Sequence, residues 1–223
     1  MNEYSLHSAI KKWYSLPGDR FEVKIDDYIV DILRGDLLIE IQTKNFSAIK
    51  KKLADLVKNN RVRLVHPIPE QKWIIQVNEY DEIIGRRKSP KKGKLTDLFR
   101  ELIRIPKLIS EDKFSLEVLM TNQEEVRCDD GKGSWKRRGA SIKDRKLIGV
   151  NSRILLNNRN DFLRFLPKNL DDAFTNKGLA NSRGISISMA QKITYCLKKS
   201  GVIAVKEKKG KELTFVVYGA DQK

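Results

Sequence analysis

Three short apolar runs, joined by two-residue turns, constrain the fold of this chain more than any other feature. Two residues between apolar, β-rich runs are typical of β-hairpins. The sequence therefore predicts a three-stranded antiparallel meander. Its runs are FEVKI (21–25), YIVDILR (28–34) and LLIEIQT (37–43), separated only by Asp26-Asp27 and Gly35-Asp36.

Two carboxylates, Asp31 and Glu40, lie inside this apolar meander. If Gly35-Asp36 is the turn, Asp31 faces Glu40, and Cβ atoms of directly opposed residues are roughly 4.5–5.5 Å apart. The same count across the first turn places Glu22 opposite Asp31. Like charges this close, in strands apolar on both faces, repel each other and resist ionisation. The meander therefore needs something that compensates its acids.

A divalent cation would compensate these acids. Carboxylate oxygens from Asp31 and Glu40, with the backbone carbonyl of Ile41, are ligands that suit Mg²⁺ or Mn²⁺. The alternative is that both carboxylates lie at a solvated sheet edge or pair with Lys24 and Arg20. The sequence predicts Mg²⁺ or Mn²⁺ as the cofactor and leaves this alternative open.

The segments around the meander extend the pattern over residues 1–80. Apolar residues with helical spacing predict a helix over 5–15, and a second helix capped by Asn45. Residues 61–68 (RVRLVHPI) and 72–77 (KWIIQV) read as two further strands. The predicted order is helix, three strands, helix, strand.

This order, with Asp31 on the second strand and Glu40-Ile41-Gln42 on the third, resembles the PD-(D/E)XK nuclease superfamily. The resemblance implies an αβββαβ core and a catalytic metal site that includes Asp31 and Glu40. It also implies a further acid, often from the first helix of the core. Glu3 is the candidate there, and Glu22 is the alternative from a strand.

One position departs from the pattern of that superfamily. Gln42 stands where the family usually has a lysine, and glutamine orients a water without bringing a positive charge. Lys44, two residues further along the strand, is the expected substitute for this charge, with Lys50 and Lys51 as alternatives. The departure leaves open a catalytically inactive site on a nuclease-like scaffold.

The balance of charge points to a polyanionic partner. The chain has 45 Lys and Arg against 29 Asp and Glu, a net charge of +16. Residues 1–80 hold 13 basic and 11 acidic residues, residues 81–150 hold 18 and 12, and residues 151–223 hold 14 and 6. Localised positive charge of this kind is typical of nucleic-acid-binding proteins.

Other classes of protein are not favoured by the sequence. The two cysteines, Cys128 and Cys196, and the two histidines, His7 and His66, have no metal-ligand spacing, so neither a zinc site nor a disulfide framework is expected. No apolar run reaches the 18 or so residues that a membrane span needs. We expect a cytoplasmic protein with no membrane partner and no small-molecule cofactor.

The C-terminal region resembles a winged helix-turn-helix domain over about residues 170–218. Its pattern is a short helix (176–182), a turn at Arg183-Gly184, a longer helix (187–199) and two strands (202–206 and 212–218) around the loop KEKKGK. The resemblance implies DNA binding by the outward face of the second helix and by the lysines of the wing. The expected contacts are Ser188, Gln191, Lys192, Tyr195, Lys199, Lys206, Lys208, Lys209 and Lys211.

The middle of the chain contains two basic segments expected to be exposed loops. They are GRRKSPKKGK (85–94) and KGSWKRRGASIKDRK (132–146). The second mixes basic and aromatic residues, which suits a nucleic-acid backbone or an unstacked base, and we include Arg137 and Arg138 among the predicted DNA contacts. The fold of residues 81–165 as a whole is not assigned.

Together these patterns predict an α+β or α/β protein with three parts: a nuclease-like domain (1–80), a basic middle region (81–165) and a winged helix (166–223). The predicted function is a Mg²⁺-dependent DNA endonuclease with DNA as its partner, and a homodimer is left open. The alternative is an inactive nuclease-like protein that binds DNA or regulates through its winged helix. A third reading gives the tail a protein partner.

Overall fold

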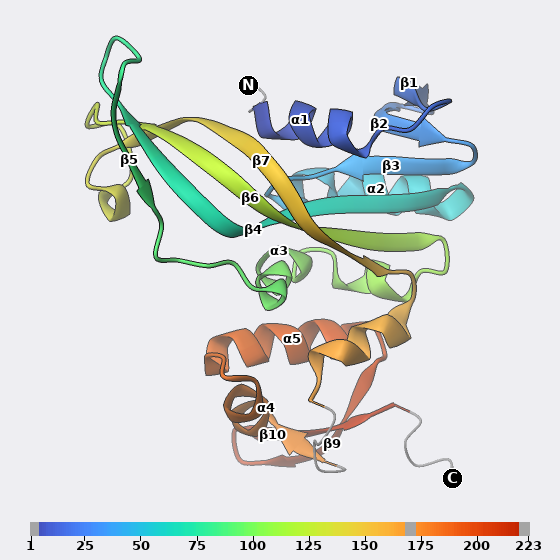
Figure 1. The fold of residues 1–223 in the computed structure, drawn as a ribbon. Helices are drawn as coiled ribbons and strands as arrows, with labels where there is room; N and C mark the ends of the chain where they lie inside the picture. Colours follow the sequence, from blue (N-terminus) through green and yellow to red (C-terminus); the bar gives the residue numbers. More distant parts are fainter. Residues whose placement is uncertain (1–4, 168–172, 219–223) are drawn as a thin grey trace. The chain divides into compact units, whose positions relative to one another are not determined.

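The computed structural model describes residues 5–167 and 173–218 and has a mixed α+β architecture (Figure 1). The order helix, three strands, helix, strand predicted for the first 80 residues is present. Its elements are α1 (Ser5–Tyr14), β1 (Arg20–Ile25), β2 (Tyr28–Arg34), β3 (Leu37–Ile41), α2 (Phe46–Asn59) and β4 (Arg61–Val77).

The largest sheet contains strands from both the N-terminal part and the middle of the chain. Its order is β1-β2-β3-β4-β6-β7, and β5 pairs with β4. The added strands are β5 (Ile83–Lys88), β6 (Phe114–Cys128) and β7 (Ser141–Leu156). Between and after them lie the short helices η1 (Leu95–Leu98), α3 (Phe99–Leu102), η2 (Pro106–Ser110), η3 (Trp135–Arg137) and η4 (Arg159–Phe165).

Three local predictions are corrected by these strands. The two strands expected at 61–68 and 72–77 are one 17-residue strand, β4. The basic segment 85–94 is not wholly a loop, since Arg86, Arg87 and Lys88 pair with β4. The loop expected over 132–146 ends earlier, where β7 begins. In each case hydrogen bonding to a neighbouring strand overrides a local composition typical of loops.

The N-terminal meander has the register that the turn spacing predicts. Ile32 pairs with Ile39 and Leu33 with Leu38. On the other side Phe21 pairs with Ile32 and Val23 with Val30. Glu22 and Asp31 are therefore at the same level of β1 and β2, but they are not themselves paired, and Glu22 has a φ of 50°. The ladder is thus locally distorted at these two acids.

Helix α1 covers one face of this meander, as Figure 1 shows. Its buried residues Leu6, Ile10 and Tyr14 repeat every four positions and form a single apolar stripe. They pack in one core with residues of the sheet, which include Ile32, Ile39, Ile41, Val65 and Leu119. This packing fixes the helix face that meets β2 and β3.

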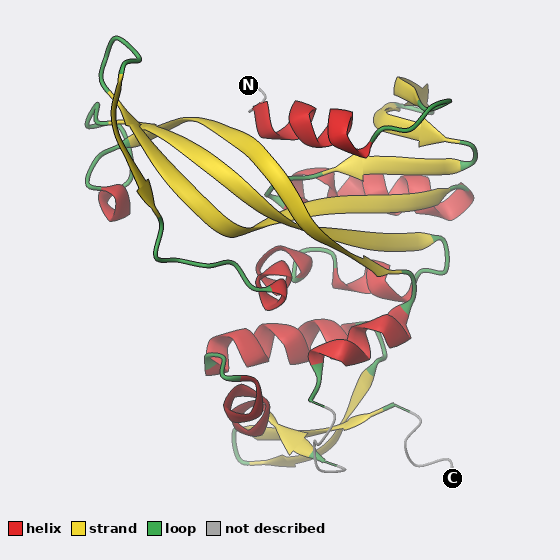
Figure 2. Cartoon of the chain, viewed as in Figure 1, coloured by secondary structure: helices red, strands yellow, loops and turns green. Residues whose placement is uncertain are grey.

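The C-terminal part contains two helices and a small three-stranded sheet of order β8-β10-β9 (Figure 2). Side-chain caps begin both helices: Thr175 accepts from the Gly178 N–H, and Ser186 accepts from the Met189 N–H. Between the helices, Gly184 has a φ of 59°, a left-handed conformation that favours glycine. The elements are β8 (Phe174–Thr175), α4 (Asn176–Arg183), α5 (Ile187–Lys199), β9 (Ile203–Lys209) and β10 (Glu212–Val217).

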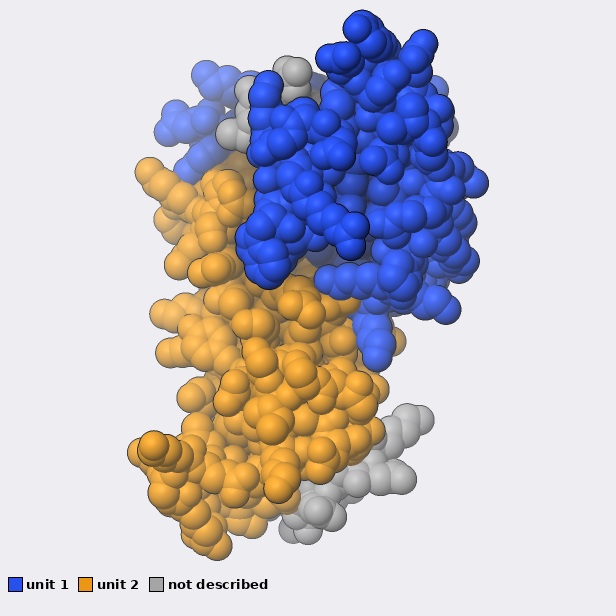
Figure 3. All heavy atoms as spheres, turned by 90° about the vertical axis from the view of Figure 1, so that its left-hand side faces the viewer, with its two compact units in different colours: residues 1–43, 65–95, 117–154 blue, residues 44–64, 96–116, 155–223 orange. Residues whose placement is uncertain are grey.

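The chain divides into two compact units, coloured separately in Figure 3. Unit 1 consists of residues 1–43, 65–95 and 117–154, and unit 2 of residues 44–64, 96–116 and 155–223. Each unit is therefore assembled from three separate stretches of sequence. Within the described ranges, no helix has the length and apolar character that crossing a membrane requires.

Candidate functional site

The acidic cluster of unit 1 is centred on Asp31, whose side chain is only 14% exposed. Three groups contact its carboxylate. The ammonium of Lys11 lies 3.3 Å from Oδ1, and His7 Nε2 lies 3.3 Å from Oδ2. The N–H of Ile41 donates to Oδ2 at 2.8 Å. Two of these groups come from α1, one turn apart on the same face.

These contacts favour the charged forms of both acid and base. Burial opposes ionisation of Asp31, but the hydrogen bonds from His7 and Ile41 and the positive charges nearby outweigh it and lower the pKa of Asp31. Burial likewise opposes the charge on Lys11, yet its bonds to Glu22 and Asp31 raise the pKa of Lys11. Lys11 thus links two of the three predicted carboxylates. The ammonium group of Lys11 is thus a positive charge beside Glu22 and Asp31, the two acids predicted to face each other.

Glu40 lies on the opposite face of the meander from the core formed with α1. It is 4% exposed and lies on β3 between Ile39 and Ile41, which both pack in the core with α1. Because side chains alternate along a strand, Glu40 points to the other face of β3. The ladder between β2 and β3 stops at Ile32 and Ile39, and Asp31 bonds the N–H of Ile41 rather than its carbonyl oxygen.

Of the residues predicted to activate water, Gln42 and Lys44 follow β3 closely, and the alternatives Lys50 and Lys51 lie on α2. The Gln42 N–H donates to the Val65 carbonyl at 2.9 Å, and the Gln42 carbonyl oxygen lies 2.7 Å from His66 Nδ1. Lys44 is exposed and belongs to unit 2, whereas Asp31 belongs to unit 1. The alternatives Lys50 and Lys51 are exposed on α2, also in unit 2.

The donors expected for a metal are not gathered in this part of the chain. Over residues 5–167 and 173–218, no group of three or more His, Cys, Asp or Glu side chains has the spacing to hold a metal ion. Glu3, one of the two candidate additional ligands, lies outside the described residues. A divalent cation at Asp31 and Glu40 stays a prediction.

A second candidate site, which we call the basic pocket, is a hollow of about 360 Å³ in unit 1. Five basic side chains line it, from β5, β6 and the loop between β6 and β7. Within the described ranges, Asp129 is the one acid in the lining. The basic residues are Arg87, Arg127, Lys136, Arg137 and Arg138, and the remaining lining is Ile74, Gln76 and Ala140.

The loop that presents three of these side chains is closed on itself. The Gly133 N–H donates to the Gly139 carbonyl at 2.6 Å, and Arg137 Nε donates to the Ala140 carbonyl at 3.0 Å. Arg138 adopts a φ of 54°. A Cβ on Gly133 would lie 1.7 Å from the Ala140 carbonyl oxygen, so only glycine fits there. The closed loop holds Lys136, Arg137 and Arg138 next to one another.

Glu125 offsets only part of the positive charge beside the pocket, because three basic residues share this one carboxylate. Glu125, 4% exposed at its side chain, accepts from Arg127 at 2.5 Å, and both Lys72 and Arg145 lie 3.2 Å away. Burial opposes its charge, but the bonds from Arg127 and Lys72 lower the pKa of Glu125 to about 2. Glu125 thus fixes Arg127 at the pocket wall.

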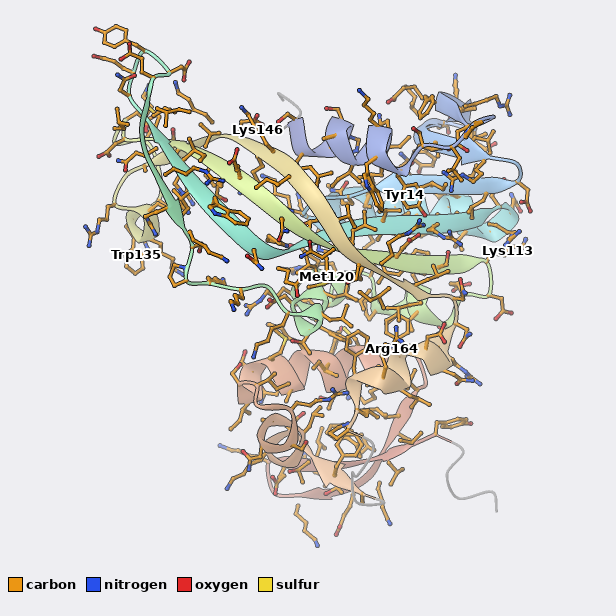
Figure 4. The ribbon with its side chains drawn as sticks, viewed as in Figure 1. Tyr14, Lys113, Met120, Trp135, Lys146 and Arg164 are labelled. Atoms are coloured by element: carbon orange, nitrogen blue, oxygen red, sulfur yellow. The ribbon has the colours of Figure 1, made fainter. Side chains whose placement is uncertain are left out.

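Trp135 stands beside this pocket on the same loop. Its side chain is 83% exposed, and Figure 4 shows it at the outer end of the loop. The ammonium of its neighbour Lys136 lies 5.7 Å from the ring centroid, within cation–π range. An indole this exposed next to a basic pocket is available to stack on a planar ligand.

The DNA contacts predicted in the tail fall into two sets. The α5 residues Ser188, Gln191, Lys192 and Tyr195 line a hollow together with Ile103, and Lys199 lines a neighbouring one. Helix α5 contacts α3 and η2, so this face is the wall of a groove. The wing lysines Lys206, Lys208, Lys209 and Lys211 are exposed on and between β9 and β10, where Lys209 pairs with Glu207 at 3.3 Å.

Several residues of these sites were not identified from the sequence. His7 and Lys11 are four residues apart on α1, a spacing that places both on one helix face. That spacing was the one feature of the sequence that could have indicated that they act together. Arg87 and Arg127 join Arg137 and Arg138 only through strand pairing that links distant segments. Lys136 lies inside the basic segment whose two neighbouring arginines were selected.

The fold and its two sites define a mixed α+β protein with an ion-paired acidic cluster and a basic pocket. The chain belongs to the family described as "Domain of unknown function (DUF8091)", whose model matches residues 4–157. It is similar to an "Uncharacterized protein" of Treponema pallidum (strain Nichols), with 29% identity over 210 residues, covering 94% of this chain and 83% of that protein. No solved structure matches the chain significantly.

Proposed function

We propose that this protein binds nucleic acid, with DNA as the ligand, and that the basic pocket is the principal contact. The observation that carries the proposal is that, of the described residues, five basic side chains and one acid line a single hollow of unit 1. Guanidinium groups match phosphate geometry in a bidentate manner, and this pocket contains four of them. A net charge of +16 supports attraction of a polyanion over longer distances.

Two further features support a nucleic acid rather than an isolated anion. Trp135 offers an exposed aromatic face beside the pocket, as proteins that bind unstacked bases do. The exposed wing lysines Lys208 and Lys209 add positive charge in unit 2 and suit phosphate contacts. Phosphate contacts of this kind give affinity that depends strongly on salt and little on sequence.

The proposal is tested by fluorescence anisotropy with labelled duplex DNA, single-stranded DNA and RNA of equal length. We expect binding that weakens linearly on a plot of log K against log salt. Polyglutamate of matched charge serves as the competitor, since it carries charge without phosphates or bases. Competition by polyglutamate as effective as by unlabelled DNA, or no binding at low salt, would contradict the proposal.

A Mg²⁺-dependent DNA endonuclease is the second candidate. The observation in its favour is a largely buried Asp31 carboxylate, held ionised beside His7, in a chain with the αβββαβ order. The described donors do not gather into a metal site, and Lys11 already neutralises Asp31 and Glu22. The inactive, DNA-binding alternative is therefore the better supported of the two.

These two readings are separated by incubation with supercoiled plasmid in Mg²⁺, Mn²⁺ or EDTA. The endonuclease reading predicts metal-dependent nicking that Asp31→Asn abolishes while DNA affinity is kept. Retarded plasmid without nicking in any metal would eliminate it and leave the DNA-binding function. Asp27→Asn, at an exposed position of the turn between β1 and β2, makes the same change of charge and is the matched control.

A further inference from the structure

A groove runs along α5 in unit 2, which we call the α5 groove. It consists of two hollows of about 460 and 350 Å³. The larger lies between α2, the segment from Ile103 to Leu108, and α5, and the smaller continues along α5. Ile103 and Tyr195 line both hollows, so the two adjoin at these residues.

The groove has an apolar lining. Val57 and Ala54 of α2 face it from one side, while Ile103, Ile105 and Leu108 line it from the segment after α3. Tyr195 is 42% exposed although it lies where the two hollows meet. Val57, Ile105 and Leu108 are buried and form its floor, whereas Ala54, Ile103 and Tyr195 keep accessible surface. Apolar surface left accessible in a concave site is typical of places where a partner buries its own apolar side chains.

The charges around this apolar lining are nearly all positive. Among the residues that the structure describes, six basic residues line the two hollows and one acid, Glu111, accompanies them. A partner that complements this surface must carry negative charge on both sides of an apolar stripe. The basic residues are Lys50, Lys58, Arg104, Lys107, Lys192 and Lys199.

The length of the groove identifies the shape of the partner. The lining residues of α5 extend from Ser188 to Lys199. At a rise of about 1.5 Å per residue this is a length of roughly 16 Å, or three helical turns. An amphipathic helix of that length presents anchors at positions i, i+4 and i+7 to such a groove.

We propose that the α5 groove binds an acidic amphipathic helix of a partner protein. Its apolar stripe packs against Ile103, Tyr195 and the α2 residues, and its acidic flanks pair with the basic rim. A nucleic acid fits the charge but not the apolar lining, because nucleic-acid interfaces are polar and use phosphates rather than apolar ridges. The proposal does not rest on the DNA-binding function, whose principal contact is in unit 1.

The test is a selection of 16-residue peptides from a random display library on the full chain at physiological salt. We expect the enriched peptides to carry net negative charge and apolar residues at i, i+4 and i+7. The variant Ala54→Glu places bulk and negative charge in the groove at an exposed position. It should weaken binding of a labelled selected peptide at least about tenfold.

The matched control is Ala48→Glu, an exposed alanine of the same helix that does not line the groove. It should change the peptide affinity less than twofold, and both variants should keep wild-type DNA affinity and thermal stability. Enrichment of basic peptides, or equal losses in both variants, would overturn the proposal. Displacement of the peptide by duplex DNA, with Ala54→Glu weakening DNA equally, would also overturn it and assign the groove to nucleic acid.

Discussion

Lys11 gives the acidic cluster its stability by joining Glu22 and Asp31 through one ammonium group. The turn spacing of the meander correctly places Glu22 and Asp31 at one level of adjacent strands. That spacing cannot identify the compensating cation, because Lys11 belongs to α1 and not to the meander. The position of α1 depends on the packing of Leu6, Ile10 and Tyr14. The acid pattern alone is therefore compatible with either a metal or a lysine.

The role of Lys11 can be measured by substitution. Lys11→Met removes the charge but keeps much of the apolar stem, leaving Asp31 with His7 and the Ile41 N–H. We expect a loss of about 1–3 kcal/mol in the free energy of unfolding at pH 7, measured in urea. Lys12→Met, at the exposed neighbouring position, should change it by less than about 0.5 kcal/mol. Equal effects would contradict a structural role for Lys11.

Glu125 makes stability depend on pH in the acid range. Its pKa in the folded protein is about 2 against an ordinary value of 4.5, so its contribution is complete above pH 4.5 and is lost as the pH falls toward 2. The shift corresponds to about 3 kcal/mol. We expect urea unfolding to show stability falling over this range, and Glu125→Gln to be less stable at pH 7 with a flatter acid profile. An unchanged profile in the variant would contradict this account.

The order of helices and strands along the chain was largely predictable from the sequence. The pairing of strands from distant segments was not. Short turns and apolar periodicity predicted α1, the meander, α2 and the elements from α4 to β10 within a few residues. The segment 85–94 and the join at Pro69-Glu70 were misjudged because their strand conformation is stabilised by pairing with distant strands. Asn45 was predicted to cap α2, yet it has a φ of 60° and makes no side-chain cap bond.

The loop between β6 and β7 requires glycine at position 133. A substitution there can therefore change how the basic side chains are held without removing any of their charges. Gly133→Ala removes no charge but places a Cβ against the backbone of Ala140, so the loop must open. We expect DNA affinity to fall several-fold while the unfolding midpoint stays near that of the wild type, as measured by anisotropy and thermal melting. Gly149→Ala, at a strand position where a Cβ meets nothing within 4 Å, is the control.

The predicted wing corresponds to the hairpin of β9 and β10, and the proposed DNA-binding function predicts a second, smaller electrostatic contribution from it. Lys208→Gln with Lys209→Gln removes two exposed charges near its turn. Each phosphate contact contributes about 0.9 to the slope of log K against log salt, so we expect the slope to decrease by at most about 2. The decrease should be the same for unrelated DNA sequences. A change that differs between sequences would contradict a backbone contact.

The two compact units are interleaved along the chain, and this organisation explains why the sites were only partly predictable. Unit 1 brings together residues 87, 127 and 136–138, and unit 2 brings α2, the segment after α3 and α5 together. Net charge predicted a polyanion binder in general terms, but position within the fold determines where that charge is concentrated. A segment-by-segment reading of basic residues could not identify the basic pocket or the α5 groove.

The most direct test compares two triple variants of equal net charge. Arg87→Gln, Lys136→Gln and Arg138→Gln remove exposed basic residues of the pocket, and Lys12→Gln, Arg20→Gln and Lys24→Gln remove exposed ones elsewhere in unit 1. Both sets lower the net charge from +16 by three, to +13. We would measure duplex DNA affinity over a range of salt concentrations. The account predicts a slope about 2–3 smaller and a large loss of affinity only in the pocket set. Equal losses in both sets would contradict it and attribute binding to net charge alone.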